Sequence, residues 1–394
     1  MSDITDLPEP DPAARDHSRR VVDAVVAAIR DNSGVISFAD YMDLVLHAPG
    51  LGYYSTGSRK FGQEGDFITA PELSPWYSRC IARQCRQVLE VLDSPAIIEA
   101  GPGSGIMACD ILLELERLNL LPDRYVMLET SAELRERQQQ LAREKTPHLA
   151  ETMQWWDSLP EEPLEGIVLA NEVLDAMPVH RVRYNNGCFT ELGVTEKDGK
   201  LDWMPFPLAD QGLLNEIERR MGELVAVLPE NYETEFNLYS DAWLRSMAGV
   251  INRGAMLLVD YGYTRSEYYH PQRLIGTLLC HYRHRVHADP FYYPGLQDIT
   301  ASVDFTAIAE TAVDAGLKVG GFTTQAHFLM ACGLLEMIRS DEPLSETEQA
   351  KRSQQVKILT MPAEMGERCK VMALARDLDI DWLGFGMTDL RSRL

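Results

Sequence analysis

The stretch that decides the fold reads Ala96-Ile-Ile-Glu99-Ala-Gly101-Pro102-Gly103-Ser104-Gly105. A short apolar run of β character ends in an acid, three glycines follow at alternate positions, and a helical pattern begins at Ile106. Glycine lets a backbone approach a ligand closely, and the first amides of a helix attract anionic groups. The stretch therefore predicts a strand, a turn and a helix that bind a nucleotide-type cofactor.

The position of the acid and the glycines separates three kinds of cofactor site. A P-loop needs a lysine after its last glycine, and none follows here. A nicotinamide-dinucleotide turn needs its third glycine where Ile106 stands, which disfavours an oxidoreductase. An acid two positions before the first glycine, as Glu99 is, resembles the first motif of class I methyltransferases, which bind S-adenosylmethionine (SAM). A tight turn without a ligand is the alternative, and the flanking sequence decides between them.

The composition of the chain limits the kinds of partner and compartment that we expect for it. The net charge of −23 argues against a nucleic-acid substrate, because phosphate binding needs a basic face. No apolar run is long enough to span a membrane, which argues against membrane insertion. The start of the chain is acidic and proline-rich, unlike a targeting peptide, and the seven cysteines form no CxxC pair. We expect a cytoplasmic protein whose partner is a protein or a small molecule; the sequence also allows a homodimer.

From Ala96 onward, short apolar runs alternate with helical patterns, which predicts an α/β fold with a parallel sheet. The expected class is the Rossmann-like class I methyltransferase fold, a seven-stranded, mostly parallel sheet with helices on both faces, a helical N-terminal cap and insertions. The expected strands are Ala96–Ala100, Arg124–Leu128, Met153–Asp157, Gly166–Ala170, Ala255–Val259, Leu317–Thr323 and Lys370–Ala375.

Breaks in these patterns predict the organisation of the chain. Turn signals at Asn185-Asn186-Gly187 and at Asp198-Gly199 indicate hairpins inside a segment that interrupts the sheet. The expected segments are a disordered tail (1–16), a helical cap (17–93), the first half of the cofactor core (94–180), an inserted substrate subdomain (181–253), and the second half of the core (254–394) with a long loop (264–303) and a helical insertion (325–368).

Polar residues that follow the expected strands are candidates for the site, because open α/β sheets bind ligands at the carboxyl ends of their strands. Glu129 follows the second strand, where an acid can take both ribose hydroxyls. Trp155, Trp156 and Asp157 end the third strand and suit an adenine pocket, with ordinary packing of the tryptophans as the alternative. Asn171 ends the fourth strand, with helix capping as its alternative role.

The glycine turn and six further stretches resemble one branch of the class I methyltransferases. This branch is the family of the mitochondrial complex I assembly methyltransferase and its bacterial relatives. The stretches span about residues 50–375, and their order is specific to the family. They are Gly65-Asp66-Phe67-Ile-Thr-Ala-Pro71-Glu72, Glu99 to Gly105, Asn171-Glu172-Val-Leu-Asp175-Ala-Met-Pro178, Val259-Asp-Tyr-Gly262, Gly276-Thr277-Leu278, Asp298-Ile-Thr-Ala-Ser-Val-Asp-Phe305 and Met365-Gly366-Glu367.

The resemblance implies a SAM-dependent protein methyltransferase whose target, in the mitochondrial members, is an arginine of a respiratory-complex subunit. It also implies a cofactor site whose acid faces the methionine end of SAM. The residues that this implies for the cofactor, with Asp157 added from its position, are Asp66, Phe67, Glu99, Gly101, Pro102, Gly103, Gly105, Glu129 and Asn171. One departure is Ser302, where the family pattern leads us to expect a histidine.

Methylating an arginine calls for carboxylates near the methyl group, because the guanidinium remains protonated and must be oriented as a proton leaves. Glu172 and Asp175 follow the fourth strand, and Glu72 lies in the cap. We expect these three as catalytic or substrate-facing residues, with helix capping or a salt bridge as the alternative role of each.

The sequence disfavours a metal site but leaves an alternative to protein methylation open. His281, His284 and His287 have a spacing that suggests a metal site, but Arg283 and Arg285 between them oppose a cation, so we expect no metal. A SAM-binding assembly factor with little catalysis, or a small-molecule methyltransferase, is the alternative to protein methylation.

Overall fold

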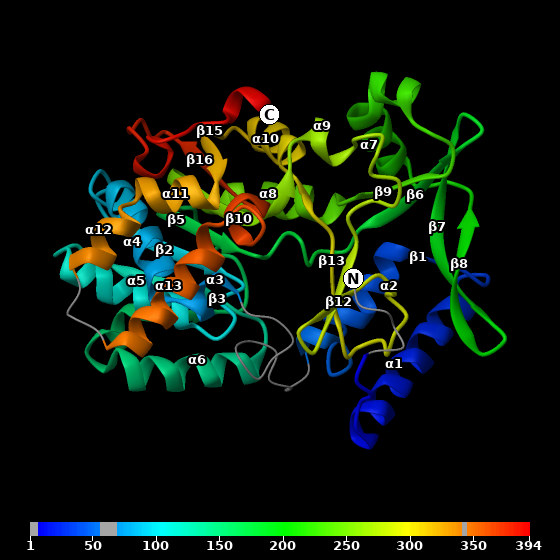
Figure 1. The fold of residues 1–394 in the computed structure, drawn as a ribbon, viewed down its shortest axis with the longest axis horizontal. Helices are drawn as coiled ribbons and strands as arrows, with labels where there is room; N and C mark the ends of the chain where they lie inside the picture. The colour runs from blue at the N-terminus through cyan, green and yellow to red at the C-terminus, as the bar shows by residue number, and fades with distance from the viewer. Residues whose placement is uncertain (1–6, 56–68, 341–344) are drawn as a thin grey trace. The chain divides into compact units, whose positions relative to one another are not determined.

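The computed structural model describes residues 7–55, 69–340 and 345–394 (Figure 1). The chain forms two compact units, each assembled from three segments. The N-terminal unit comprises Met1–Phe67, Leu174–Ala242 and Tyr263–Ala307, and the sheet unit comprises Ile68–Val173, Trp243–Gly262 and Ile308–Leu394. No helix in the described ranges is long and apolar enough to cross a membrane.

A largely parallel sheet forms the centre of the sheet unit, with the strand order β15–β16–β10–β5–β2–β3–β4. The strands are β2 (Ala96–Ala100), β3 (Arg124–Leu128), β4 (Met153–Trp156), β5 (Leu164–Asn171), β10 (Ile251–Tyr263), β15 (Lys318–Thr324) and β16 (Cys369–Arg376). Each of the seven expected strands is found, and the α/β class is confirmed. Neighbours from β4 to β10 pair in parallel, whereas β16 runs antiparallel to both β10 and β15.

The helices of this unit follow the strands, as a sheet of parallel crossovers requires. They are α3 (Ala70–Leu73), α4 (Pro75–Leu89), α5 (Ile106–Arg117), α6 (Ala132–Lys145), α11 (Gln325–Ala331), α12 (Leu334–Ser340), α13 (Glu346–Thr360) and α14 (Met365–Arg368). Two more, α8 (Leu238–Val250) and α10 (Phe305–Asp314), cross the boundary between the units. Ser74 caps α4 and Pro75 opens it, as the sequence predicts.

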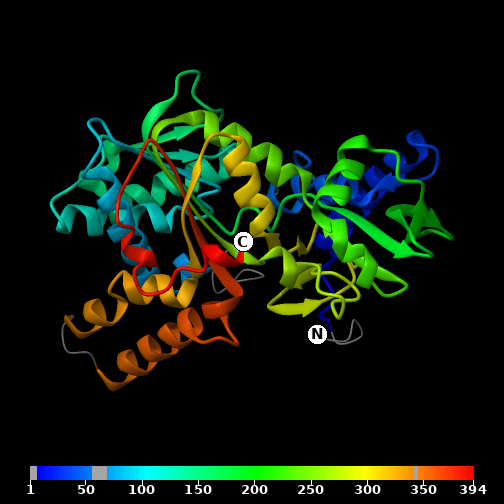
Figure 2. The ribbon, with the colours of Figure 1, turned by 90° about the horizontal axis from the view of Figure 1, so that it is seen from above.

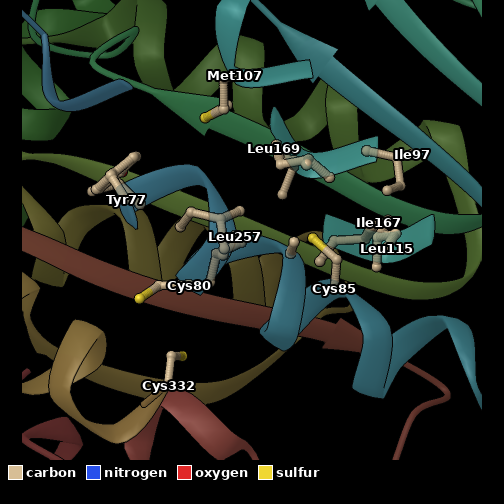
Figure 3. Packing of buried hydrophobic residues seen from close by; sticks show 14 of the residues in the cluster. Tyr77, Cys80, Cys85, Ile97, Met107, Leu115, Ile167, Leu169, Leu257 and Cys332 are labelled. Carbon is tan, nitrogen blue, oxygen red and sulfur yellow. The ribbon is translucent and has the colours of Figure 1, made fainter. Parts of the chain in front are cut away.

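A single apolar cluster holds α4, α5 and the sheet together (Figure 3). Ile97, Leu169 and Leu257 project from three adjacent strands toward Cys85 of α4, and all four side chains are buried. The alternate residues of the same strands are also buried, so the sheet is covered on both faces. Burial on both faces is why these strands read as continuous apolar runs rather than as alternating ones.

The N-terminal unit combines helices with small antiparallel sheets (Figures 1 and 2). Its helices are α1 (Pro12–Asp31), α2 (Phe38–His47), α7 (Gln211–Met221) and α9 (Arg265–Tyr268), with 3-10 turns at Tyr53–Ser55 and Gly222–Val227. One sheet has the order β1–β7–β6–β9, with β8 beside β7, and the other has the order β12–β11–β13. The strands of these two sheets are β1 (Ile36–Ser37), β6 (His180–Asn185), β7 (Cys188–Lys197), β8 (Lys200–Phe206), β9 (Tyr232–Phe236), β11 (Leu279–Tyr282), β12 (Arg285–His287) and β13 (Asp298–Thr300). The short strand β14 (Val303–Asp304) instead pairs with β10 of the central sheet.

The two hairpin predictions inside the insertion are confirmed. Asn186 and Gly187 join β6 to β7, and both have a positive φ, which the right-handed twist of two-residue hairpins requires. Asp198 and Gly199 join β7 to β8 in the same way. The long β7–β8 hairpin stands out in green in Figure 1.

The central sheet has eight strands in the described residues rather than the expected seven, because β14 pairs with β10. Two segments also differ from the sequence-based expectation. First, α1 begins at Pro12, within the range expected as a loose tail, because Asp11 caps it through the amide of Ala14 and proline opens it. Second, 264–303 is not one irregular loop, since it contains α9 and the strands of the β12–β11–β13 sheet. Those strands have three or four residues each, too few for alternation to show in the sequence.

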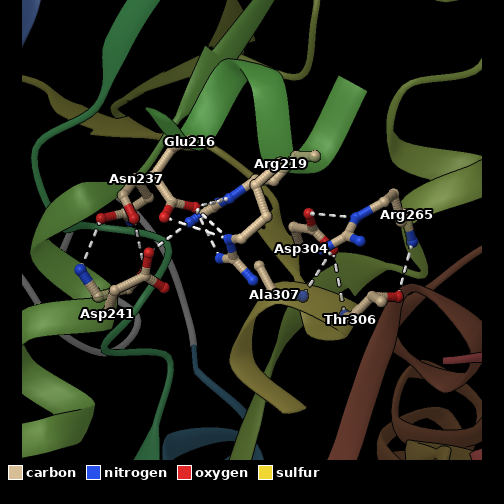
Figure 4. Close-up of polar contacts among 10 residues, drawn as sticks. Glu216, Arg219, Asn237, Asp241, Arg265, Asp304, Thr306 and Ala307 are labelled. Carbon is tan, nitrogen blue, oxygen red and sulfur yellow. Dashed lines mark hydrogen bonds and ion pairs between the residues drawn. The ribbon is translucent and has the colours of Figure 1, made fainter. Parts of the chain in front are cut away.

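A buried arginine, Arg220 of α7, ties two helices of the N-terminal unit together. Its guanidinium pairs with Glu216 on the same helix, at 2.7 Å, and with Asp241 at the start of α8. Arg220 and Asp241 are both almost fully buried. Figure 4 shows the side chains of Glu216 and Asp241, the two carboxylates that pair with the Arg220 guanidinium. The neighbouring Arg219 also pairs with Glu216, but its side chain is 33% exposed.

We expect Arg220→Met to lower the free energy of unfolding by about 3–5 kcal/mol, because it breaks the buried ion pair between Arg220 and Asp241 by removing one partner. Urea denaturation followed by circular dichroism measures this change. Arg219→Met is the matched control: it removes the neighbouring, more exposed arginine, which pairs with Glu216, and should lower the free energy of unfolding by less than about 1 kcal/mol. Equal losses in the two variants would contradict a special role for the buried pair.

Candidate functional site

The glycine turn joins β2 to α5 at the centre of the sheet. Gly101, Gly103 and Gly105 have φ values of +63°, +54° and +82°, a left-handed region that is costly for residues with a side chain. Gly105 stands at the start of α5 and offers no side chain to cap it. A Cβ at Gly101 would lie 3.0 Å from Val173, and one at Gly105 would lie 3.1 Å from Gln138. The turn is therefore close-packed, with its backbone at the surface that a ligand would meet.

The turn lies where the strand order reverses. β2 pairs with β3 on one side and with β5 on the other. The strands that follow β2 in the chain therefore lie first on one side of it (β3 and β4) and then on the other (β5 and β10). Open α/β sheets bind their ligands at such a switch point, outside the carboxyl ends of the strands. Glu99, Glu129, Asp157 and Asn171 all lie at or just beyond the carboxyl ends of β2 to β5. The structure thus gathers the predicted polar residues at one edge of the sheet.

Glu99 is the buried acid of the site, with 2% of its surface exposed. Its Oε2 accepts a hydrogen bond of 2.7 Å from the hydroxyl of Tyr125. Burial raises the pKa of Glu99 to about 8, and the hydrogen bond from Tyr125 only partly offsets this. At neutral pH the carboxyl therefore carries a proton for most of the time, until a cationic group pairs with it.

Glu129 follows β3, and the amide of Ser131 and the side chain of Gln138 hold its two carboxylate oxygens. These contacts measure 2.8 and 3.1 Å. Burial raises the pKa of Glu129, although these hydrogen bonds act in the opposite direction. Asp157, just after β4, is exposed, and the preceding carbonyl of Trp156 accepts the amide of Glu129 at 2.9 Å.

Gln138 of α6 is the residue of the site that the sequence did not reveal. Its Nε2 donates to the carbonyl of Gly103 at 2.8 Å and to Glu129, and its Oε1 accepts from the indole of Trp155 at 3.0 Å. One fully buried amide thus joins the glycine turn, the second strand and the third. The only signal in the sequence is a glutamine in a run of three on a polar helix, which no pattern separates from its neighbours.

Asn171 and Glu172 end β5 in a strained conformation. Glu172 has φ +52°, which is uncommon for a residue with a long side chain. Its Oε1 accepts from the backbone amide of Ala70 at 3.3 Å and from the side chain of Asn171 at 3.2 Å. The oxygen of the Asn171 side chain accepts in turn from the hydroxyl of Tyr77. Strain of this kind is retained where a side chain must be aimed, which fits a functional position.

Glu72 and Asp260 complete the acidic edge of the sheet unit. Glu72, in α3, accepts a hydrogen bond from the hydroxyl of Ser104, so it contacts the glycine turn directly. Asp260 is almost fully buried in β10, and its two oxygens accept the amides of Val173 and Tyr261 at 3.1 and 2.8 Å. Both oxygens of Asp260 are thus engaged by backbone amides, one just after β5 and one within β10.

Two predicted residues, Asp66 and Phe67, lie outside the described residues. A third, Asp175, belongs to the N-terminal unit, where it is 6% exposed and its carbonyl accepts the amide of Ala301 at 2.9 Å. The adjoining Ser302, where a histidine was expected, donates its amide to the hydroxyl of Thr277 at 3.0 Å.

No group of three or more His, Cys, Asp or Glu residues in the described part of the chain is arranged to hold a metal ion. His281 and His287 lie on β11 and β12 of the small sheet, and burial lowers the pKa of His281 to about 4.

The groups at this edge suit SAM chemically. The glycine turn presents a backbone without side chains at three positions, and the start of α5 favours the anionic carboxylate of the cofactor. A buried acid such as Glu99 complements a cationic ammonium group, and an acid after the second strand complements ribose hydroxyls.

Comparisons with known proteins agree with this geometry. A family model described as "Putative S-adenosyl-L-methionine-dependent methyltransferase" matches residues 80–323. The crystal structure of a superfamily member from Burkholderia thailandensis bound to S-adenosyl-homocysteine superposes with a TM-score of 0.93 at 39% identity, covering 98% of this chain and all of the other. A second, native structure from the same organism gives a TM-score of 0.90.

Curated relatives are more distant. The protein arginine methyltransferase NDUFAF7 homolog, mitochondrial, of Drosophila melanogaster is 29% identical over 374 residues, which cover 87% of this chain and 82% of the relative. The protein arginine methyltransferase NDUFAF7, mitochondrial, of Mus musculus is 29% identical over 387 residues, which cover 87% of this chain and 81% of the relative.

Proposed function

Since the chain belongs to the SAM-dependent methyltransferase family whose model it matches, we propose that it transfers a methyl group from SAM to an arginine side chain of a partner protein. The observation that carries the proposal is the strained Glu172, whose carboxylate is held by two hydrogen bonds beside the glycine turn. The names of the curated relatives support arginine as the target. A subunit of a respiratory complex is the first candidate partner, because the family resemblance implies one.

The proposed cofactor site assigns one part of SAM to each group of residues. Glu99 faces the cationic methionine end, and the turn from Gly101 to Gly105, with Pro102, wraps it. Glu129, held by Gln138, takes the ribose hydroxyls. Asp157 lies at the adenine, Asn171 closes the site from β5, and the resemblance adds Asp66 and Phe67 from the cap.

SAM supplies a methyl group on a sulfonium, which a nucleophile displaces in line. The protein must therefore hold one guanidinium nitrogen close to the methyl carbon and balance the charge as that nitrogen loses a proton. We assign this role to Glu172, with Glu72 as a second carboxylate that orients the guanidinium. Asp175, three positions after Glu172, is the third candidate. The products are a methylated arginine, S-adenosylhomocysteine and one proton.

The proposal also covers the compartment of the reaction, the segment that binds the substrate and the charge of the partner. All seven cysteines are free thiols, which supports the cytoplasm as the compartment. The inserted segment 181–253 is the proposed substrate subdomain, and the chain's net charge of −23 favours a basic protein as the partner.

The pKa of Glu99 predicts how SAM binding depends on pH. Because the folded pKa, about 8, lies above the ordinary value for glutamate, the stability that the protonated form contributes is lost as pH rises through 8. A cation beside Glu99 favours the carboxylate, so SAM affinity should rise with pH up to about 8, by up to about tenfold per pH unit, and then level off. Calorimetry between pH 6 and 9 measures the slope. Glu99→Gln should remove it; an unchanged slope in that variant would assign the proton to another group.

The test of the proposed function is transfer of label. The purified protein is incubated with radiolabelled SAM and a lysate of its own host from which the gene has been deleted. We expect one or few labelled protein bands. Label in small molecules alone would favour small-molecule methylation, and SAM binding without any labelled product would favour an assembly factor.

A further inference from the structure

The N-terminal unit contains an open pocket of about 660 Å³ that none of the residues discussed above for the cofactor lines. It is formed by the end of α1, the start of α2, strands β6 and β7, the end of β8, and the starts of α7 and α8. We call it the acidic pocket. Its volume is in the range of sites that bind a small ligand or a side chain.

Aromatic side chains form one part of the wall. Phe206, at the end of β8, packs against Gly193 of β7, where a Cβ would come within 2.7 Å of the ring. Tyr239, at the start of α8, is 42% exposed, so its ring is available to a bound group. Aromatic faces and apolar neighbours such as Ile36 suit the aliphatic stem of a long side chain and the face of a cation.

The polar part of the lining is negative. It includes the carboxylates of Asp40, Glu191 and Asp210 and no lysine or arginine. Glu191 is 3% exposed, and its Oε1 is bonded to Nδ1 of His180 at 2.8 Å, so the carboxylate of this pair is fixed in place. A pocket lined by three carboxylates, with His180 as the one titratable base among its described lining residues, complements a cation.

Asp40 and Asp210 use only part of their hydrogen-bonding capacity within the fold. Oδ2 of Asp40 accepts from the hydroxyl of Ser37 at 2.6 Å, and Oδ1 of Asp210 accepts the amide of Leu213 at 2.7 Å. In the described part of the chain, the second oxygen of each accepts no further hydrogen bond, and both residues are exposed. Asp40, with Asp43, also raises the pKa of Tyr239, although burial is the larger cause.

We propose that the acidic pocket docks an arginine side chain of the protein substrate, at a position other than the methylated residue. The stem packs on Phe206 and Tyr239, and the guanidinium donates to the remaining oxygen of Asp40 and of Asp210. This inference rests on the proposed function, because it takes the ligand to be part of the methylated protein. It adds a second recognition point that would restrict methylation to partners with two suitably spaced basic residues.

Binding of a fluorescent hexa-arginine peptide, followed by anisotropy at low salt, tests the pocket without needing the natural partner. Asp40→Asn with Asp210→Asn removes both charges, and asparagine still caps helices. We expect this double variant to bind about tenfold more weakly, as the loss of two partly exposed ion pairs implies. Its SAM affinity should stay unchanged. A hexa-citrulline peptide, which lacks the charge, should bind neither protein.

The matched control is Asp198→Asn with Asp202→Asn, which removes two exposed charges of the same unit outside the pocket lining. It should bind hexa-arginine within about twofold of the wild type. Equal weakening in both double variants would show that only net charge matters and would overturn the proposal. Failure of the wild type to bind the peptide would overturn it as well.

The labelling experiment separates this inference from the proposed function. If the lysate contains no methylated protein but the Asp40 and Asp210 variant loses peptide binding, the pocket stands as an arginine site and the proposed function fails. If proteins are labelled equally by the wild type and this variant at limiting lysate, the function stands and the docking role fails.

Discussion

Gly103→Val is expected to lower the affinity for SAM by more than 100-fold and to abolish methyl transfer. Gly103 has φ +54°, and a β-branched residue is strongly disfavoured there. The substitution must therefore either shift the turn or fill the space against its backbone. Either change also disturbs the carbonyl of Gly103, which accepts the amide of Gln138 and so ties the turn to Glu129. Calorimetry with SAM measures the loss directly.

A matched control separates loss of the site from backbone strain in general. Gly187 has φ +77° at the tip of the β6–β7 hairpin, and a Cβ there would meet nothing within 4 Å. Gly187→Val should strain the backbone similarly but leave SAM affinity within about twofold of the wild type. If Gly103→Val bound SAM as the wild type does, the assignment of Glu99 to Gly105 as the cofactor turn would be wrong.

Glu172→Gln is expected to lower kcat by about 100-fold to 1,000-fold while SAM affinity changes less than about threefold. The amide oxygen of glutamine can still accept from Ala70 and Asn171, so the variant keeps both hydrogen bonds and removes only the charge. Loss of one preorganised charge that balances the transition state costs about 3–4 kcal/mol. Initial rates on the labelled partner, measured at saturating SAM, test this.

Glu151→Gln serves as the control for Glu172→Gln, because Glu151 is an exposed glutamate of the same unit. It should leave kcat and SAM affinity unchanged. A Glu172→Gln enzyme with normal kcat would remove this carboxylate from the chemistry and leave Glu72 and Asp175 as the candidates. A large loss of SAM affinity instead would mean that Glu172 holds the cofactor rather than the substrate.

The strands and the glycine turn could be predicted because their signals are local. A short apolar run that ends in Glu99, followed by alternate glycines, needs no distant partner to be recognised, and β2 and the left-handed turn are found there. The hairpin at Asn186 and Gly187 is local in the same sense, since φ above zero is required at both positions.

What the sequence did not reveal depends on contacts between distant segments. Gln138 joins Gly103, Glu129 and Trp155 only because α6 packs beside the turn. No local pattern distinguishes Arg220 from the other basic residues of its amphipathic helix, because its partner Asp241 lies 21 positions later in the chain. The division of Glu172 and Asp175 between two units, three positions apart in one motif, also follows from packing that no local pattern encodes.

The most direct test of the central claim is the chemical identity of the label. A protein band labelled by the wild type from radiolabelled SAM is excised and hydrolysed in acid, and its amino acids are separated beside methylated standards. We predict that the label migrates with a methylarginine and that the Gly103→Val protein produces no such label. Label that migrates with methyllysine, or that is lost as volatile methanol from a methyl ester, would contradict arginine methylation.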